Sequence, residues 1–325
     1  MRIKGLDSLR FISALWVTFY HLGSFPLTQG VDRSKLDGKI FGALYDTVFC
    51  GPAAVIVFFV ISGFCIHLPN IKQNTEINIR KFWLRRYVRI LVPWGISLLP
   101  MIVLGWSYDS TGYLVGWSIE CELFYYTVYP IILYIKRFIN LRYMTTVAFM
   151  GGFVIVISNP GMMQYPSFGL LGNALLGLPC WLLGCLLAEI HSDKRESRLN
   201  VYHWRIIIFC LNCCCYSLML HMKIGFPYTL NIFSIFCFFW LRAEISHYKN
   251  SPTIKWIEYS GKWSYSLYLL HGTINKLFNS LPDLNFGFIM NWVLKFSLII
   301  ILSYIFYIAI ERPSHTFAKS LGKRK

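Results

Sequence analysis

The stretch Gly51-Pro52-Ala53-Ala54-Val55-Ile56-Val57-Phe58-Phe59-Val60-Ile61-Ser62-Gly63-Phe64 contains no charged residue and decides the fold class. Apolar runs of about 16 to 22 residues recur along the chain, and each is roughly long enough to cross a bilayer core of ~30 Å as a helix. Of the 325 residues, 56% are hydrophobic and only 14% are charged. In a soluble domain, about a quarter of the residues are charged. The sequence therefore predicts an all-α, polytopic membrane protein.

About ten transmembrane helices are expected, and the basic residues between them set their orientation. Most of the 31 Lys and Arg residues fall on one side, while the loops of the other side hold only Arg33, Lys35, Lys39 and Lys223. This asymmetry follows the positive-inside rule and predicts that the N- and C-termini are both cytoplasmic. The net charge of +16 then reflects topology, and no nucleic acid partner is predicted. The expected spans are residues 10–27, 49–69, 90–105, 117–135, 143–158, 169–190, 205–221, 227–241, 260–279 and 290–310.

No polar block is long enough to fold separately. We therefore expect one transmembrane domain over residues 1–313 and a basic cytoplasmic tail over residues 314–325. Arg10 and His21 interrupt the first apolar run, which is interpreted as a true helix rather than a cleavable signal peptide. Most of the 10 cysteines lie in apolar spans, without histidines at zinc spacing. Buried thiols behave as small hydrophobic groups, so no metal site is predicted.

The first span carries a stripe of polar residues. Ionisable residues inside a span cost about 2.5–3.5 kcal/mol on insertion scales, so each of them points to a function. Arg10 and His21 are separated by about three helical turns, so they project from nearly the same face, roughly 16 Å apart along the axis. Asp7 shares that face at i,i+3 spacing from Arg10. The stripe predicts a buried site, although a lone intramembrane histidine can also be a packing residue.

Two further groups are predicted to reach the layer of His21. Glu122 lies about five residues from the outer end of its span and His21 about six, so both sit in the outer half of the bilayer. A histidine and a carboxylate at one depth can form a base and its orienting partner, although Glu122 could instead form a structural pair. His271 ends the stretch Tyr265-Ser266-Leu267-Tyr268-Leu269-Leu270-His271 and is expected at a similar depth, in a structural or substrate-positioning role.

A basic loop precedes the third span. From Ile79 onward, Arg85, Arg86 and Arg89 are interleaved with Phe, Trp and Tyr, a pattern typical of an amphipathic helix at the membrane interface. Attraction to anionic lipid explains the charge, while a specific anionic ligand explains the charge and the aromatic residues together. The sequence leaves both explanations open.

Six short motifs follow one another from residue 5 to residue 313. They are Leu6-Asp7-Ser8-Leu9-Arg10 with His21, Phe58-Phe59-Val60-Ile61-Ser62-Gly63-Phe64, Arg86-Tyr87-Val88-Arg89, Trp117-Ser118 with Glu122, Tyr126 and Pro130, Tyr265 to His271, and Glu311-Arg312-Pro313. Together they resemble the motifs of the acyltransferase 3 family, whose members are membrane enzymes that O-acylate bacterial surface sugars. The chain departs from the family pattern at Phe124, where many members carry Gln, which affects the expected acceptor contacts near Glu122.

The resemblance implies an enzyme of the O-antigen O-acetyltransferase type, a multi-pass protein of the bacterial inner membrane. An acyl group, most simply acetyl, would pass from cytoplasmic acyl-CoA to a hydroxyl of a cell-surface or lipid-linked sugar. Acyl-CoA is then a donor substrate, so no permanently bound cofactor is expected, and membrane lipid is a further partner. The resemblance assigns three sets of residues: His21 and Glu122 to catalysis, Arg10, Arg85, Arg86 and Arg89 to the donor phosphates, and Asp7, Ser62, Trp117, Tyr265 and His271 to substrate positioning.

Two questions stay open in the sequence. The first is whether the acyl group passes through a covalent intermediate on histidine. The second is a different class of function, because a polytopic transporter or flippase of a polysaccharide or lipid intermediate also combines ten spans with intramembrane charges. A transporter predicts inverted repeats and broken helices in matching halves, and no internal repeat is evident in this chain.

Overall fold

The computed structural model of the protein describes residues 3–23, 32, 34–71, 77–106, 113–193, 199–281 and 286–321. Within these ranges every regular element is a helix, which confirms the all-α prediction. Helical segments long and apolar enough to cross a membrane make the chain a multi-pass membrane protein. Among the residues that the structure describes, six segments meet this criterion: Leu36–Asn70, Ile79–Val103, Tyr165–Ser192, Val201–Met222, Phe226–Asn250 and Phe288–Ser320.

The described helices follow one another with short connections. They are α1 (Leu6–Leu22), α2 (Leu36–Val48), α3 (Gly51–His67), η2 (Leu68–Asn70), α4 (Ile79–Ser97), α5 (Leu99–Val103), α6 (Tyr113–Ile135), α7 (Leu141–Ile157), η4 (Tyr165–Phe168), α8 (Gly169–Ser192), α9 (Val201–Met222), α10 (Phe226–Asn250), α11 (Lys255–Ser260), η5 (Gly261–Trp263), α12 (Ser264–Asn279), α13 (Phe288–Phe306), the π-helical turn η6 (Tyr307–Glu311) and α14 (Arg312–Ser320).

The remaining expected spans are also helical, at α1, α6, α7 and α12. α1, α7 and α12 are shorter than the six long segments, and α6 carries two glutamates, so length and composition alone do not assign these four to the membrane. Of the residues used to orient the spans, Arg33 lies outside the described residues, as do residues 322–325 of the expected tail. Residues 314–320 of that tail belong to α14, which begins at Arg312.

Residues 36–48 and the end of α1 differ from expectation. Residues 36–48, expected within an outer loop, form α2, because Leu36, Ile40 and Leu44 recur at every fourth residue and make one exposed apolar stripe. α1 ends at Leu22 rather than residue 27, since Gly23 follows with φ +83° and leaves the helical conformation. His21 therefore occupies the last turn of α1, and residues 24–27, the expected outer end of this span, lie outside the described residues.

α3 is buried on nearly all sides and packs closely on α8. A Cβ atom added at Gly63 would collide with the carbonyl oxygen of Trp181, and one added at Gly184 with the carbonyl oxygen of Val60. Small residues on both helices let the two backbones approach each other directly, as is usual for helix pairs in membranes. This crossing holds α3, and with it Ser62, at the centre of the molecule.

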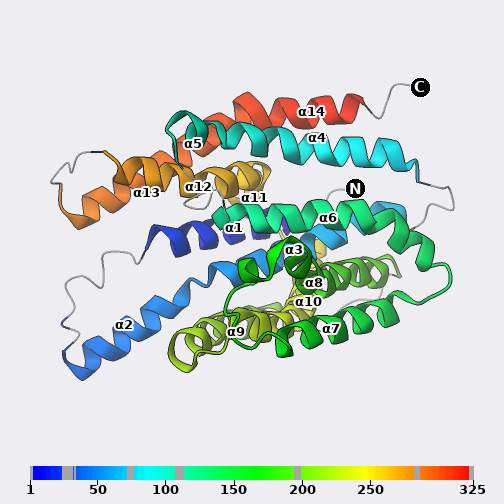
Figure 1. Ribbon diagram of the computed structural model, residues 1–325, viewed down its shortest axis with the longest axis horizontal. Coiled ribbons are helices and arrows are strands. Elements are labelled where there is room, and N and C mark those ends of the chain that lie inside the picture. Colours follow the sequence, from blue (N-terminus) through cyan, green and yellow to red (C-terminus); the bar gives the residue numbers. More distant parts are fainter. Residues whose placement is uncertain are drawn as a thin grey trace.

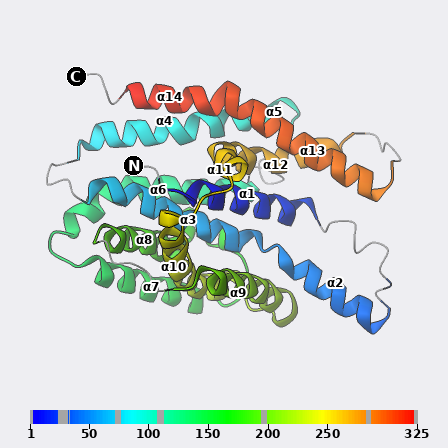
Figure 2. The same ribbon diagram turned by 180° about the vertical axis from the view of Figure 1, so that it is seen from behind.

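The helices form two flanks with α1, α3 and α6 between them (Figure 1). α4 and α14 run side by side along one flank, and α7 and α9 lie on the other, in both views (Figures 1 and 2). The Ser314 hydroxyl of α14 donates a hydrogen bond of 3.0 Å to the carbonyl of Val88 on α4. Thus α14 packs against the membrane-crossing body instead of extending away from it.

Candidate active site

A cavity of about 650 Å³ lies among α1, α3, α4, α6, α12 and α14. Cationic side chains outnumber carboxylates on its walls, so the cavity favours an anionic ligand. The cations are Arg10, Arg86, Arg89, Lys262, Arg312 and Lys319, and the carboxylates are Asp7, Glu122 and Glu311. The part lined by Val55, Phe58, Phe59 and Ile119 is apolar. A ligand with a charged end and a long, less polar arm matches this division.

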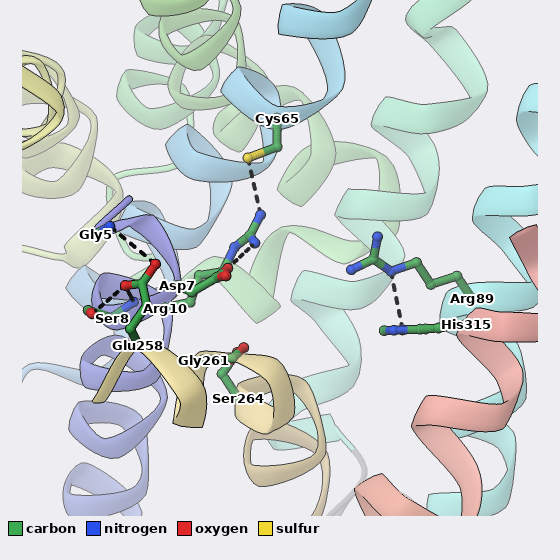
Figure 3. Close-up of polar contacts among 10 residues, drawn as sticks. All are labelled: Gly5, Asp7, Ser8, Arg10, Cys65, Arg89, Glu258, Gly261, Ser264 and His315. Carbon is green, nitrogen blue, oxygen red and sulfur yellow. Dashed lines mark hydrogen bonds and ion pairs between the residues drawn. The ribbon is translucent and has the colours of Figure 1, made fainter. Parts of the chain in front are cut away.

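Arg10 connects α1 to α3 across the cavity. One guanidinium nitrogen donates to the Asp7 carboxylate at 3.1 Å and another to the Cys65 sulfur at 3.2 Å, as Figure 3 shows. The guanidinium also lies within electrostatic range of Glu122 and Tyr126. The predicted pairing of Asp7 with Arg10 along one face of the first helix is confirmed.

The beginning of α1 is held by a residue from far along the chain. The Glu258 carboxylate accepts hydrogen bonds from the backbone nitrogens of Gly5 (3.3 Å) and Ser8 (3.1 Å) and from the Ser8 hydroxyl (2.6 Å) (Figure 3). A carboxylate at a helix N-terminus satisfies unpaired N–H groups and complements the helix dipole. A Cβ at Gly261 would collide with the backbone of Asp7. The segment from α11 to η5 therefore fixes the position of Asp7 and Arg10.

Glu122 is hydrogen-bonded within the cavity. Its carboxylate accepts from the Tyr126 hydroxyl and, at 2.8 Å, from the Ser62 hydroxyl. Ser62 in turn accepts a hydrogen bond of 3.3 Å from the indole nitrogen of Trp181. In the described part of the chain no hydrogen bond joins Glu122 to His21, so the expected base–carboxylate pair is not formed. The prediction of this pair compared the depths of Glu122 and His21 on the assumption that the first helix continues to residue 27, whereas α1 ends at Leu22.

His21 instead pairs with His271. The Nδ1 atom of His21 lies 2.9 Å from the Nε2 atom of His271, and the two rings are stacked at 21°. His271 is fully buried, and the Asn275 amide donates to the backbone carbonyl of His21 at 3.0 Å. The expectation that His271 reaches the layer of His21 is confirmed, and the two histidines are in direct contact.

The hydrogen bonds assign the tautomers of the neutral pair. Nδ1 of His271 lies 2.8 Å from the carbonyl oxygen of Tyr268 and 3.3 Å from that of Leu267. Carbonyl oxygens only accept, so this nitrogen carries the proton, and Nε2 of His271 is left as an acceptor. His21 must therefore donate from Nδ1, which leaves a lone pair on its Nε2. An imidazole in this tautomer can take a proton from a hydroxyl group.

Tyr268 both lines the cavity and neighbours the histidine pair. The Tyr268 hydroxyl lies 2.6 Å from the Ser118 hydroxyl, and both residues line the cavity. Tyr268 is also one helical turn before His271, and the two ring centroids are 6.0 Å apart. The histidines themselves do not line the cavity. Tyr268 is the lining residue that neighbours them.

The three arginines of the basic loop differ in environment. Arg86 and Arg89 line the cavity, and Arg86 lies over the Tyr126 ring, 5.7 Å from its centroid. Arg89 donates a hydrogen bond of 3.2 Å to Nε2 of His315 and faces the same space as Arg10 (Figure 3). Arg85 is exposed and does not line the cavity. Adjacent helical residues point about 100° apart, so Arg86 faces the cavity while its neighbour Arg85 points away from it.

Two of the residues assigned to substrate positioning have different surroundings. Tyr265 lines the cavity and donates from its hydroxyl to the carbonyl of Ile90 at 3.1 Å. Trp117 is buried, does not line the cavity and stacks on Tyr165 with 5.4 Å between ring centroids. Its neighbour Ser118 lines the cavity instead.

Several residues that line the cavity are not among those predicted from the sequence. Lys262, Arg312, His315 and Lys319 contribute to its wall, and Glu311 accepts hydrogen bonds from the backbone nitrogen (3.0 Å) and hydroxyl of Ser266. The sequence does contain a pattern that could have predicted the role of α14. Residues 312, 315, 316 and 319 have the spacing of one helical face. The tail was interpreted only as a run of positive charge.

Comparison with known proteins agrees with the geometry. No curated protein and no solved structure gives a significant match to the chain. A family model described as an acyltransferase domain matches residues 3–308, nearly the whole chain, and this match gives no support to the transporter alternative. The chain, a multi-pass membrane protein, therefore belongs to the acyltransferase 3 family.

Proposed function

We propose that this protein transfers an acyl group, most simply acetyl, from cytoplasmic acyl-CoA to a hydroxyl of a cell-surface or lipid-linked sugar. The observation that carries the proposal is the cavity, which combines a cation-lined part with an apolar part and is lined by Tyr268, the neighbour of the two paired histidines. Along α3, the lining residues run from Val55 to Ile66, a rise of roughly 16 Å. A nucleotide phosphate end and an extended thioester arm have this division of charge and length.

In the proposed reaction, His21 acts as the general base. Its Nε2 takes the proton of the acceptor hydroxyl while the oxygen attacks the thioester carbonyl carbon. The new carbon–oxygen ester bond forms, the carbon–sulfur bond breaks, and CoA leaves as a thiolate that receives the proton from His21. His271 holds the proton of His21 on Nδ1 through the contact at 2.9 Å. This direct route requires no covalent acyl-histidine.

The donor phosphates are assigned to Arg10, Arg86 and Arg89, because guanidinium groups bind phosphate oxygens bidentately. Glu122 lies within electrostatic range of Arg10 and Arg86, so its negative charge limits the excess of positive charge where the arm enters. In this arrangement Glu122 and Ser62 hold the arm and do not orient the base. Arg85 keeps the role of an interfacial cation that attracts anionic lipid.

The proposal includes the membrane arrangement. Ten crossing helices, α1, α3, α4, α6 to α10, α12 and α13, would place both termini in the cytoplasm, as the distribution of Lys and Arg favours. α1 begins and α14 finishes towards the same end of the molecule (Figures 1 and 2). The mouth, lined by residues near these two ends, would then face cytoplasmic acyl-CoA. We place the protein in the bacterial inner membrane, where such donors and lipid-linked sugars meet.

The test is acyl transfer by the purified protein. Acetyl-CoA labelled in the acetyl group is incubated with surface glycan and lipid-linked sugar extracted from cells that lack the gene. The expected result is label in the glycan or the lipid-linked sugar that mild alkali releases, as an ester requires. Absence of incorporated label from intact protein that binds acetyl-CoA would reject the sugar acceptor, and absence of acetyl-CoA binding would reject the donor.

A further inference from the structure

One face of α14 forms part of the cavity mouth. Arg312, His315, Thr316 and Lys319 all line the cavity, and their spacing places them on one side of the helix. Arg312, Thr316 and Lys319 are exposed, as is Lys262, which lines the cavity from η5. The mouth therefore carries three cations that are separate from the arginines of α1 and α4, while the Thr316 hydroxyl donates a hydrogen bond of 3.0 Å to the carbonyl of Arg312.

The fold fixes the direction of α14. Glu311, only 1% exposed, accepts hydrogen bonds from the backbone nitrogen and hydroxyl of Ser266 in the first turn of α12. The π-helical turn η6 ends at Glu311, and α14 follows it directly. From there the helix is bound to α4 through the Arg89–His315 hydrogen bond (Figure 3) and the Ser314–Val88 hydrogen bond. The cations of α14 are consequently held at the mouth in a defined position.

These cations lack the internal partners that the deeper ones have. Arg10 forms an ion pair with Asp7, and Arg89 donates to His315. Among the residues that the structure describes, no carboxylate forms an ion pair with Lys262, Arg312 or Lys319. The Lys262 ammonium lies over the Tyr259 ring, 4.4 Å from its centroid. Unpaired cations on a cavity wall concentrate anions there.

We propose that Lys262, Arg312 and Lys319 form a second anion subsite that binds the 3′-phosphate on the ribose of CoA. This inference rests on the acyl-CoA donor proposed above. CoA carries two separate anionic groups, a diphosphate joined directly to the pantetheine arm and a phosphate monoester on the ribose. Arg10 and Arg86 lie beside Tyr126 and Glu122, where the arm enters, so they suit the diphosphate. The ribose phosphate lies farther from the thioester and suits the face of α14.

The experiment compares CoA with 3′-dephospho-CoA by calorimetry on the purified full chain in lipid-free detergent. Wild-type protein should bind CoA about tenfold more tightly, the effect of one charge-assisted phosphate contact. A double variant, Arg312→Gln with Lys319→Ala, should bind both ligands with nearly the affinity that wild type has for 3′-dephospho-CoA. Lys255→Ala removes an exposed lysine outside the cavity and should keep the full preference. Size-exclusion elution checks that each variant is folded.

Three results would overturn the subsite. Wild-type protein that binds the two ligands equally has no 3′-phosphate site, and a double variant that keeps the preference has the site elsewhere. Phospholipid that copurifies with wild type and not with the variant, at unchanged preference for CoA, would assign the cations to a lipid headgroup. Failure of the underlying donor proposal gives a different result, because neither CoA nor 3′-dephospho-CoA would then bind to wild type.

Discussion

The mouth and the deep end of the cavity are built from different kinds of residue. The mouth has exposed cations on long side chains, such as Lys262 and Lys319. The deep end has the hydroxyls of Ser118 and Tyr268, both buried, next to the fully buried His271. An exposed lysine keeps many rotamers and adapts to its ligand. A buried imidazole with hydrogen bonds at both nitrogens keeps one orientation.

This difference separates binding from chemistry. Contacts at the mouth are made equally by the bound donor and by the transition state, so their loss should raise the Kd and KM for acyl-CoA and leave kcat unchanged. Contacts at the deep end involve the atoms that react, so their loss should lower kcat. Three substitutions test this division.

The largest effect is expected at the deep end, from His21→Ala. Loss of a general base lowers the rate about 10²- to 10⁴-fold, while calorimetric binding of acyl-CoA should stay close to wild type. His221→Ala is the matched control, because His221 occupies the last turn of α9 as His21 occupies the last turn of α1, and it is exposed. A His21→Ala protein with an unchanged transfer rate would reject the assignment of the base.

A smaller loss of kcat is expected at His271, which touches the base rather than the reacting atoms. His271→Leu removes the acceptor for the Nδ1 proton of His21 and should lower kcat on the order of 10²-fold, near the lower limit for loss of a general base. His271→Gln offers an amide oxygen to the same proton and should recover much of the rate. Steady-state kinetics and thermal stability are measured together. If His271→Leu and His271→Gln have equal stability and equal transfer rates, His271 contributes packing and does not orient His21.

The smallest effect is expected at the mouth, from Arg86→Ala compared with Arg85→Ala. Arg86 lines the cavity and Arg85 does not, so only the first change should raise the KM for acyl-CoA. The expected rise is about tenfold, equivalent to ~1.5 kcal/mol for a charge-assisted hydrogen bond, with kcat unchanged in both variants. Equal increases of KM in both variants would contradict a specific phosphate contact at Arg86 and would indicate that the arginines of α4 only attract anionic lipid.

Sequence periodicity was informative where local geometry decides the outcome. Arg10 and His21 lie on one helix, and Asp7 pairs with Arg10, because positions along a helix follow from its rise and turn alone. The all-α fold was predictable because each apolar run has about the length that a helix needs to cross a bilayer. His271 was expected at the layer of His21, and it is in contact with it.

Lateral neighbours could not be predicted in the same way. Two residues at one depth can be on opposite sides of a helix bundle, and Glu122 bonds to Ser62 and Tyr126 rather than to His21. Trp117 and Ser118 are adjacent in sequence, yet only Ser118 lines the cavity, since helix packing decides which face points inward. The stop of α1 at Gly23 depends on a backbone conformation that an apolar pattern does not reveal.

Both ends of α1 are held by residues that the ribosome makes much later. Glu258 bonds to Ser8 at the beginning of the helix and His271 bonds to His21 at its end, and each pair is separated by 250 residues. Contacts between such distant residues form only after the later segment has been synthesised and inserted. During biosynthesis α1 is therefore made before the residues that bind its first N–H groups and its imidazole exist. The base acquires its defined tautomer only when the final part of the chain arrives.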